Sequence, residues 1–363
     1  MPFADELISN RTAENLARAI STAAPRTPLP ALTAAAGQLA TLSLRERADL
    51  LRDALLTDVP GSYADLATVV RAAGGLSGWM IWPVTAAVAT KAVADGSDQA
   101  FDDAMAMMAE LTGLLTAEFA IRTLLRHNLD RALATVLDWT TSGDADVRRL
   151  ASEGTRPYLP WSVRVPEILH RPGVTVPILD ALHRDPSEYV RRSVANHLND
   201  LSRDHPGLVT ETASRWMDTP DIETTRVVRA GLRTLVKRGD AGALALMGFT
   251  GDPASLTIDG PALDRDVVPI GEAVGFSATV RNTGNAPARL AIDYVVSHHK
   301  ANGSQSAKIF KLTVATLQPG EMLTVRREHS FRVITTRRYH PGPHAIALQV
   351  NGLATEAATF QLV

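Results

Sequence analysis

The chain has 363 residues, of which 37 are Lys or Arg and 39 are Asp or Glu, giving a formal net charge of −2. This balance excludes a uniformly basic nucleic-acid coat protein, although it allows a local basic stripe. Cysteine is absent, which excludes disulfides, thiol nucleophiles and cysteine-ligated metal sites. The start of the chain lacks the pattern of a signal peptide, and no run of about 18 uncharged apolar residues occurs. We therefore expect a cytoplasmic protein without a membrane span.

Residues 1–250 predict a helical domain. They are rich in Ala, Leu and Arg, which favour helices, and apolar residues such as Leu111, Leu115 and Phe119 recur at helical spacing. Residues 1–117 hold 8 basic and 13 acidic residues, whereas residues 118–250 hold 18 and 17. The basic residues of the predicted helical domain are thus concentrated in its second half.

An internal repeat lies in that second half. A Val-Arg-Arg segment that begins at Val147 recurs at Val190, 43 residues later, and a weaker copy begins at Val227, 37 residues further on. Helix pairs with a period of about 40–47 residues are typical of HEAT-type solenoids. We predict such a solenoid, with the arginines of the repeats on its concave face. The alternative is that these arginines form salt bridges between repeats.

Residues 262–363 predict a small β-sandwich of immunoglobulin-like type, joined by a linker over residues 248–261. Alternating segments rich in Val, Ile and Thr are separated by turn sequences such as Asn302-Gly303 and Pro341-Gly342. The expected strands are Val274–Arg281, Leu290–Val296, Lys308–Leu317, Leu323–Phe331 and His344–Val350.

Several stretches resemble the AlkC family of HEAT-like-repeat DNA alkylation repair glycosylases, which are related to the AlkD type and carry an appended immunoglobulin-like domain. The resemblance covers nearly the whole chain and is weakest over residues 1–75. It implies a monofunctional glycosylase that removes cationic N3-alkylated bases, such as 3-methyladenine and 3-methylcytosine, from double-stranded DNA without a cofactor. The stretches that carry it are Thr116–Arg122, Val147–Pro157, Leu159–Trp161, Ser193–Pro206, Asp293–Gly303 and Thr336–Gly342.

The resemblance also implies the residues of the site. A cationic base has an activated glycosidic bond, so the enzyme needs negative charge near the developing sugar cation, a positioned water and an aromatic face. The catalytic pocket is placed at Glu118, Trp161 and Asp200. The residues that shape this pocket or hold the flanking phosphates are Arg149, Glu153 and Arg156, and Arg192 is expected to bind DNA from the next repeat.

Each candidate also has a structural interpretation. Glu118 could form a surface salt bridge with Arg122 at i+4, and Asp200 could be a helix C-terminal or capping residue. Trp161 could belong to the core.

The β domain supplies a second group of candidates. Basic and polar residues flank turns at one end of the predicted sandwich, where we expect them to bind DNA phosphates, and these are Lys300, Asn302, Lys308, Arg337 and Arg338. We interpret His298, His299, His340 and His344 as loop residues and expect no metal. No phosphate-binding glycine motif occurs, so we expect no nucleotide cofactor. We expect a monomer that associates with the nucleoid when it acts on DNA.

Two further functions remain open. A non-catalytic HEAT-repeat adaptor would bind DNA or protein through the same groove, with Glu118 and Asp200 in salt bridges or solvent and not converging on Trp161. A general scaffold would instead bind a peptide at a sheet edge of its β domain.

Overall fold

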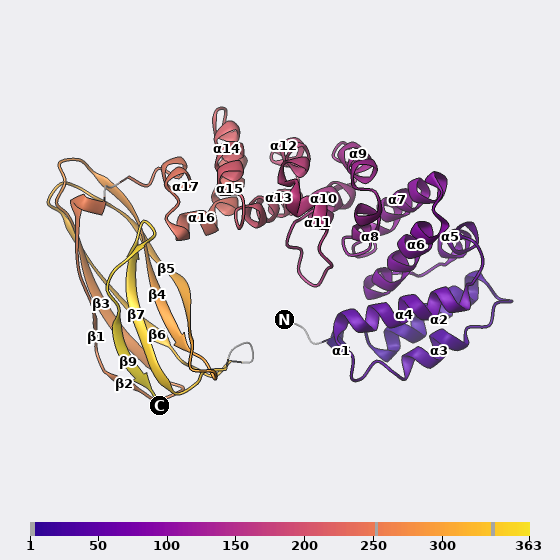
Figure 1. Cartoon of the computed structure of the whole chain (residues 1–363), viewed down its shortest axis with the longest axis horizontal. Coiled ribbons are helices and arrows are strands. Elements are labelled where there is room, and N and C mark those ends of the chain that lie inside the picture. Colours follow the sequence, from indigo (N-terminus) through magenta and orange to yellow (C-terminus); the bar gives the residue numbers. More distant parts are fainter. Residues whose placement is uncertain (1–3, 251–252, 335–337) are drawn as a thin grey trace. The chain divides into compact units, whose positions relative to one another are not determined.

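The computed structural model describes residues 4–250, 253–334 and 338–363, and its helices precede its strands (Figure 1). The last helix is α17 (Ala241–Leu246) and the first strand is β1 (Leu256–Leu263). The predicted order of a helical repeat region followed by a strand region is confirmed. The strands begin at Leu256, ahead of the predicted start at residue 262. Gly260 and Pro261, which in the sequence favour a linker, lie inside β1. No helix in the described ranges is long and apolar enough to cross a membrane.

The chain forms two compact units whose boundary does not coincide with the change from helix to strand. The first comprises Met1–Leu201 and Asp221–Gly231, and the second comprises Ser202–Pro220 and Leu232–Val363. The second unit therefore contains α14 (Pro206–Met217), α16 (Arg233–Arg238) and α17 together with the strands. Within it, the Gln349 side chain donates a hydrogen bond to the Lys237 carbonyl at 2.7 Å, which ties a strand to α16.

Serine residues begin several helices of the N-terminal region. Ser9, Ser43 and Ser62 form capping boxes, and Ser97 accepts a hydrogen bond from the Ala100 amide. A capping hydroxyl satisfies an amide that has no partner within the helix, which fixes where the helix starts. The helices of this region are α1 (Ala4–Leu7), α2 (Asn10–Ala23), α3 (Pro30–Ala36), α4 (Leu44–Asp58), α5 (Tyr63–Ala72), α6 (Ile81–Asp95) and α7 (Asp98–Thr112).

The predicted repeat corresponds to three helices that pack in succession. Val147, Val190 and Val227 are buried in α10 (Ala145–Gly154), α13 (Glu188–Leu201) and α15 (Ile222–Gly231). Helix α10 packs on α13, and α13 packs on α15. The other helices of this part are α8 (Ile121–His127), α9 (Leu129–Trp139), α11 (Pro166–His170) and α12 (Val176–Leu182).

The first arginine of each Val-Arg-Arg segment holds neighbouring repeats together. Arg148 donates to Asp185 at 2.6 and 3.1 Å, and Arg191 pairs with Glu223 at 2.7 Å. Each also donates to backbone carbonyls just before its own helix. The salt-bridge alternative therefore applies to these two arginines.

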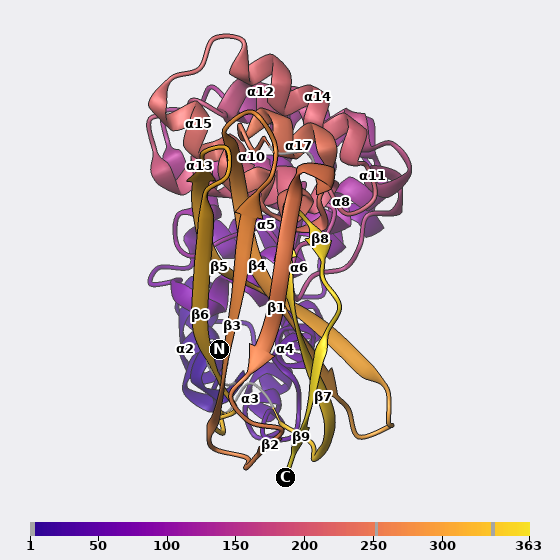
Figure 2. The same ribbon diagram turned by 90° about the vertical axis from the view of Figure 1, so that its left-hand side faces the viewer.

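The strand region forms two sheets, ordered β1-β3-β6 and β2-β9-β7-β4-β5, with β8 paired to β7. Figure 2 shows β6, β3 and β1 side by side. Every expected strand corresponds to an observed one, because alternate residues such as Phe276 and Tyr294 turn into a shared core. The strands are β2 (Val267–Val268), β3 (Ala273–Asn282), β4 (Ala288–His299), β5 (Gln305–Leu317), β6 (Met322–Ser330), β7 (Gly342–Val350), β8 (Leu353–Ala354) and β9 (Ala358–Leu362).

Candidate active site

Five of the predicted site residues form one ladder of alternating charge, which we call the ion ladder. Its order is Glu118, Arg149, Glu153, Arg156 and Asp200. Arg149 contacts both Glu118 and Glu153, the latter at 3.5 Å, and Arg156 contacts Glu153 at 2.6 Å and Asp200 at 2.8 Å. The ladder thus joins the turn before α8, helix α10 with the residues just after it, and the last turn of α13 (Figure 1).

Local structure explains why these side chains meet. Arg149 and Glu153 are four residues apart on α10, so they lie on one face of that helix. Glu118 accepts a hydrogen bond from the Thr116 hydroxyl at 3.0 Å, and Glu153 accepts one from the Ser193 hydroxyl at 2.6 Å. Each carboxylate therefore has a fixed orientation before any ligand binds.

The ladder is mostly shielded from solvent, because its side chains are only 8% to 15% exposed. Burial raises the pKa of Glu118 above its ordinary value of 4.5, while Arg149 acts in the opposite direction. Charges that are removed from water in this way interact more strongly than surface charges.

Four aromatic rings form a row that runs from Trp161 to Phe119. The ring centroids of Trp161 and Trp79 lie 6.4 Å apart, those of Trp79 and Trp82 lie 6.2 Å apart, and Trp82 stacks on Phe119 at 4.0 Å. Phe119 follows Glu118 directly in the chain, so the aromatic row meets the ion ladder at the Glu118–Phe119 peptide. Trp161 is 40% exposed and has a φ of 60°, so the interpretation of Trp161 as a core residue is wrong.

The structural interpretation of Glu118 is corrected, and that of Asp200 holds for its place in a helix. Glu118 lies just before α8, where it pairs with Arg149 and not with Arg122. Asp200 lies within the last turn of α13, as its interpretation as a helix C-terminal residue expects, and it pairs with Arg156. Both carboxylates are ion-paired, as the adaptor hypothesis expects, and both belong to one connected network.

The second arginine of each repeat segment behaves differently from the first. Arg192 and Arg229 occupy the repeat position of Arg149, and both are exposed. Within the described residues neither forms an ion pair. Arg229 is not among the predicted site residues, although the repeat alignment gives it the position that Arg192 has in the preceding repeat. Arg192 and Arg229 therefore offer positive charge on the neighbouring helices α13 and α15, whereas Arg149 is paired within the ion ladder.

In the β domain, three of the predicted residues line one hollow of about 300 Å³, which we call the basic hollow. Lys300, Lys308 and Arg338 lie around it with His299 and His340. The described residues that line it include no Asp or Glu, which suits an anion.

The remaining two candidates of the β domain are placed differently. Asn302 accepts hydrogen bonds from the amide and hydroxyl of Ser304 at 3.1 and 2.7 Å, so it shapes the turn between β4 and β5. Arg337 lies outside the described residues.

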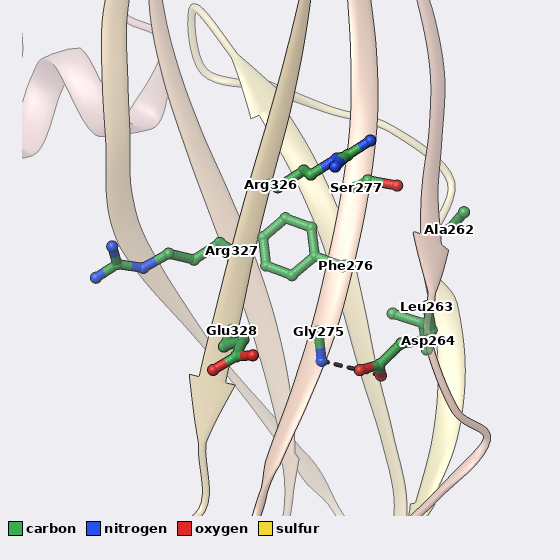
Figure 3. Close-up of a pocket in the computed structure, with 9 residues that line it drawn as sticks. All are labelled: Ala262, Leu263, Asp264, Gly275, Phe276, Ser277, Arg326, Arg327 and Glu328. Carbon is green, nitrogen blue, oxygen red and sulfur yellow. Dashed lines mark hydrogen bonds between the residues drawn. The ribbon is translucent and has the colours of Figure 1, made fainter.

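A larger hollow of about 750 Å³ lies on the three-stranded sheet (Figure 3). The side chains of Arg326 and Arg327 point in opposite directions from β6, while Asp264 accepts a hydrogen bond from the Gly275 amide. Because Glu328 and Asp264 accompany the arginines, the mixed charge of this hollow does not favour an anion.

The histidines are not all loop residues, contrary to expectation. His298 and His299 end β4, and His344 is buried in β7. The rings of His298 and His344 lie 5.9 Å apart, and burial lowers the pKa of His344. Among residues 4–250, 253–334 and 338–363, no group of three His, Asp or Glu side chains is placed to hold a metal ion.

Comparisons with known proteins cover both the helical region and the strand region of the chain. Residues 257–363 match the family described as "Uncharacterised protein YhaZ, C-terminal Ig-like domain". The chain is 32% identical to uncharacterized protein YhaZ of Bacillus subtilis (strain 168) over 325 residues, which is 88% of each chain. It is 34% identical to the Pseudomonas fluorescens alkylpurine DNA glycosylase AlkC, solved bound to DNA containing an abasic site analog, with a TM-score of 0.85 over 100% of both chains. The chain belongs to the AlkC family.

Proposed function

We propose that the chain is a DNA glycosylase for alkylated bases, like its Pseudomonas fluorescens relative, and that it removes cationic N3-alkylated bases such as 3-methyladenine and 3-methylcytosine. The observation that carries this proposal is that the ion ladder and the aromatic row share two stretches of chain, Glu118–Phe119 and the segment from Arg156 to the exposed ring of Trp161. A cationic base requires both features, since aromatic faces attract cations and carboxylates stabilise the sugar cation that forms when the base leaves.

The chemistry assigned to Asp200 follows from its contacts. When the bond between the sugar and the base breaks, both bonding electrons go to the base, which becomes neutral, and the sugar becomes an oxocarbenium-like cation. Each Asp200 oxygen accepts one hydrogen bond from Arg156, at 2.8 and 3.1 Å, and a carboxylate has further lone pairs that can accept from water. Asp200 would stabilise the cation and hold the water, whose oxygen bonds to the sugar carbon while its proton passes to the carboxylate and then to solvent.

Glu118 and Trp161 receive complementary roles. Glu118 lies beside the aromatic row, where its charge attracts the alkylated base. Trp161 presents an exposed ring at the other end of that row, where it offers an aromatic face. Arg149, Glu153 and Arg156 hold the two outer carboxylates in place.

We further propose that the β domain binds double-stranded DNA through the basic hollow. Lys300, Lys308 and Arg338 would contact backbone phosphates, and Arg192 would do so from the solenoid. The protein would act as a monomer in the cytoplasm, at the nucleoid, without a metal or nucleotide cofactor.

The test is direct excision. Purified full-length protein is incubated with methylated double-stranded DNA in the presence of EDTA, and released bases and abasic sites are measured against an enzyme-free control. We expect release of 3-methyladenine and 3-methylcytosine. No release at an excess of enzyme would contradict the proposal and favour the adaptor function, which also accounts for the ion pairing of Glu118 and Asp200.

A further inference from the structure

Arg122 in α8 is a fully buried arginine that binds only backbone oxygen atoms. It donates to the carbonyls of Val163 at 2.6 Å, Gly154 at 2.9 Å and Arg156 at 2.8 Å, and its residue is 0% exposed. All three acceptors lie between the last residue of α10 and the start of α11. One guanidinium therefore gathers the two ends of the connecting segment 154–163.

The charge of Arg122 is not balanced by a direct partner. Within the described residues it forms no ion pair with a carboxylate, and its Nη2 atom has no hydrogen-bond partner. Burial is the main cause that lowers the pKa of Arg122, to about 10, so the group is still a cation at neutral pH. The charges of Asp200 and Glu118 act in the opposite direction and favour the cation, so Arg122 is coupled electrostatically to both carboxylates at the ends of the ion ladder.

The segment that Arg122 holds carries two parts of the candidate active site. Arg156, at one end, donates to Asp200 and Glu153. Trp161 lies between Arg156 and Val163, the attachment points on either side of it, and its φ of 60° is unfavourable for a residue with a large side chain. A segment that contains such a residue keeps its shape only when the surroundings fix it.

We propose that Arg122 is a positioning residue for the candidate active site. By holding the backbone on both sides of Trp161, it sets the ring of Trp161 at the end of the aromatic row and the guanidinium of Arg156 against Asp200. The catalytic consequence of this inference rests on the proposed function.

The test replaces Arg122 with lysine, which keeps the positive charge but lacks the planar fork that reaches several carbonyls. We expect single-turnover excision by Arg122→Lys to slow about 10- to 100-fold, since small misplacements of catalytic groups have effects of that size. The dissociation constant for DNA containing an abasic site analog should change by less than about twofold. Should this variant fail to fold, Arg122→Gln, which can still donate to one carbonyl, replaces it with the same expectations.

Arg47 in α4 provides a matched control. It is also buried and also donates to three backbone carbonyls, those of Leu42 at 2.9 Å, Ile8 at 2.8 Å and Ala40 at 3.3 Å. Arg47→Lys should leave single-turnover excision unchanged. Wild-type excision by Arg122→Lys would overturn the inference, and so would an equal slowing in both lysine variants, because that would indicate a general effect on stability.

A second measurement does not depend on activity. The contribution of Trp161 to acrylamide quenching of tryptophan fluorescence is obtained by comparing each protein with its Trp161→Phe counterpart. We expect the quenching of Trp161 to increase in Arg122→Lys and to stay unchanged in Arg47→Lys. No change in Arg122→Lys would overturn the inference. If the wild-type protein excised no alkylated base, the proposed function would fail, while this measurement would still decide the role of Arg122.

Discussion

Arg156 and Asp200 are joined by two parallel hydrogen bonds, from Nε to Oδ2 at 2.8 Å and from Nη2 to Oδ1 at 3.1 Å. A bidentate pair of this kind fixes both the position and the plane of the carboxylate. The same guanidinium donates to Glu153 at 2.6 Å through its third nitrogen. Arg156 thus connects the carboxylate of α13 to the carboxylate of α10.

Removing Arg156 should destabilise the protein. Arg156→Met leaves Asp200 and Glu153 mostly buried without their partner, and breaking a buried pair from one side typically costs about 3–5 kcal/mol. Urea unfolding of full-length protein measures the change, with Arg192→Met as the control, since an exposed arginine without an ion pair should alter the free energy of unfolding by less than about 0.5 kcal/mol. Equal stabilities of the two variants would contradict the importance assigned to the ladder.

The pH dependence of excision should report Glu118. Burial raises the pKa of Glu118 above the ordinary glutamate pKa of 4.5. As the pH falls, Glu118 therefore becomes protonated before the pH reaches 4.5. The neutral form favours the native state, so this contribution to stability is present below pH 4.5 and is lost as the pH rises through the raised pKa. Activity has the opposite dependence, because the charged form is the one that attracts a cationic base.

Single-turnover excision between pH 4 and pH 9 should therefore decline in mild acid for the wild-type protein. Glu118→Gln should excise about tenfold more slowly at neutral pH and should lack that decline. If the decline in acid persisted unchanged in Glu118→Gln, another titratable group would be its cause. An enzyme-free control at each pH corrects for spontaneous base loss.

The two arginines of one repeat segment should have separable effects. Arg192 is exposed and Arg191 is tied to Glu223, so only Arg192 is free to contact a phosphate. Arg192→Ala and Arg229→Ala should each reduce the slope of log affinity against log salt by about one unit. Arg191→Ala should lower the free energy of unfolding and leave the slope unchanged. The same slope for Arg192→Ala and the wild-type protein would remove these arginines from the proposed DNA interface.

The basic hollow of the β domain should contribute to DNA affinity. Because the second compact unit also includes α14, α16 and α17, substitutions in the full chain are cleaner than a truncation. Replacing Lys300, Lys308 and Arg338 with alanine should weaken DNA binding and lower the salt slope by about two to three units. Arg326→Ala, in the hollow of mixed charge, serves as the control. Unchanged binding by the triple variant would favour a β domain that does not contact DNA.

The local elements follow from the sequence more readily than the site does. Strands such as Val274–Arg281 are recognisable because side chains alternate between core and solvent, and the repeat helices are marked by Val147 and Val190. The ladder depends on residues far apart in the chain, since Glu118 and Arg149 are separated by 31 positions and Arg156 and Asp200 by 44. The family resemblance named these residues, but their pairing requires the folded chain.

Other features leave no sequence signal. The partners of Arg122 are backbone carbonyls, which every residue has, so no motif distinguishes Arg122 from an arginine that pairs with a neighbouring carboxylate. The exposure of Trp161 depends on the path of one connecting segment, and that path is fixed by long-range contacts.

The most direct test of the account is the single-turnover rate of Asp200→Asn. This substitution keeps the shape of the side chain and removes the charge that would stabilise the sugar cation. We predict that Asp200→Asn binds DNA with the affinity of the wild-type protein and releases 3-methyladenine about 10²- to 10³-fold more slowly. A wild-type rate of release would contradict the assignment of Asp200 as the catalytic carboxylate and make Glu118 the next candidate.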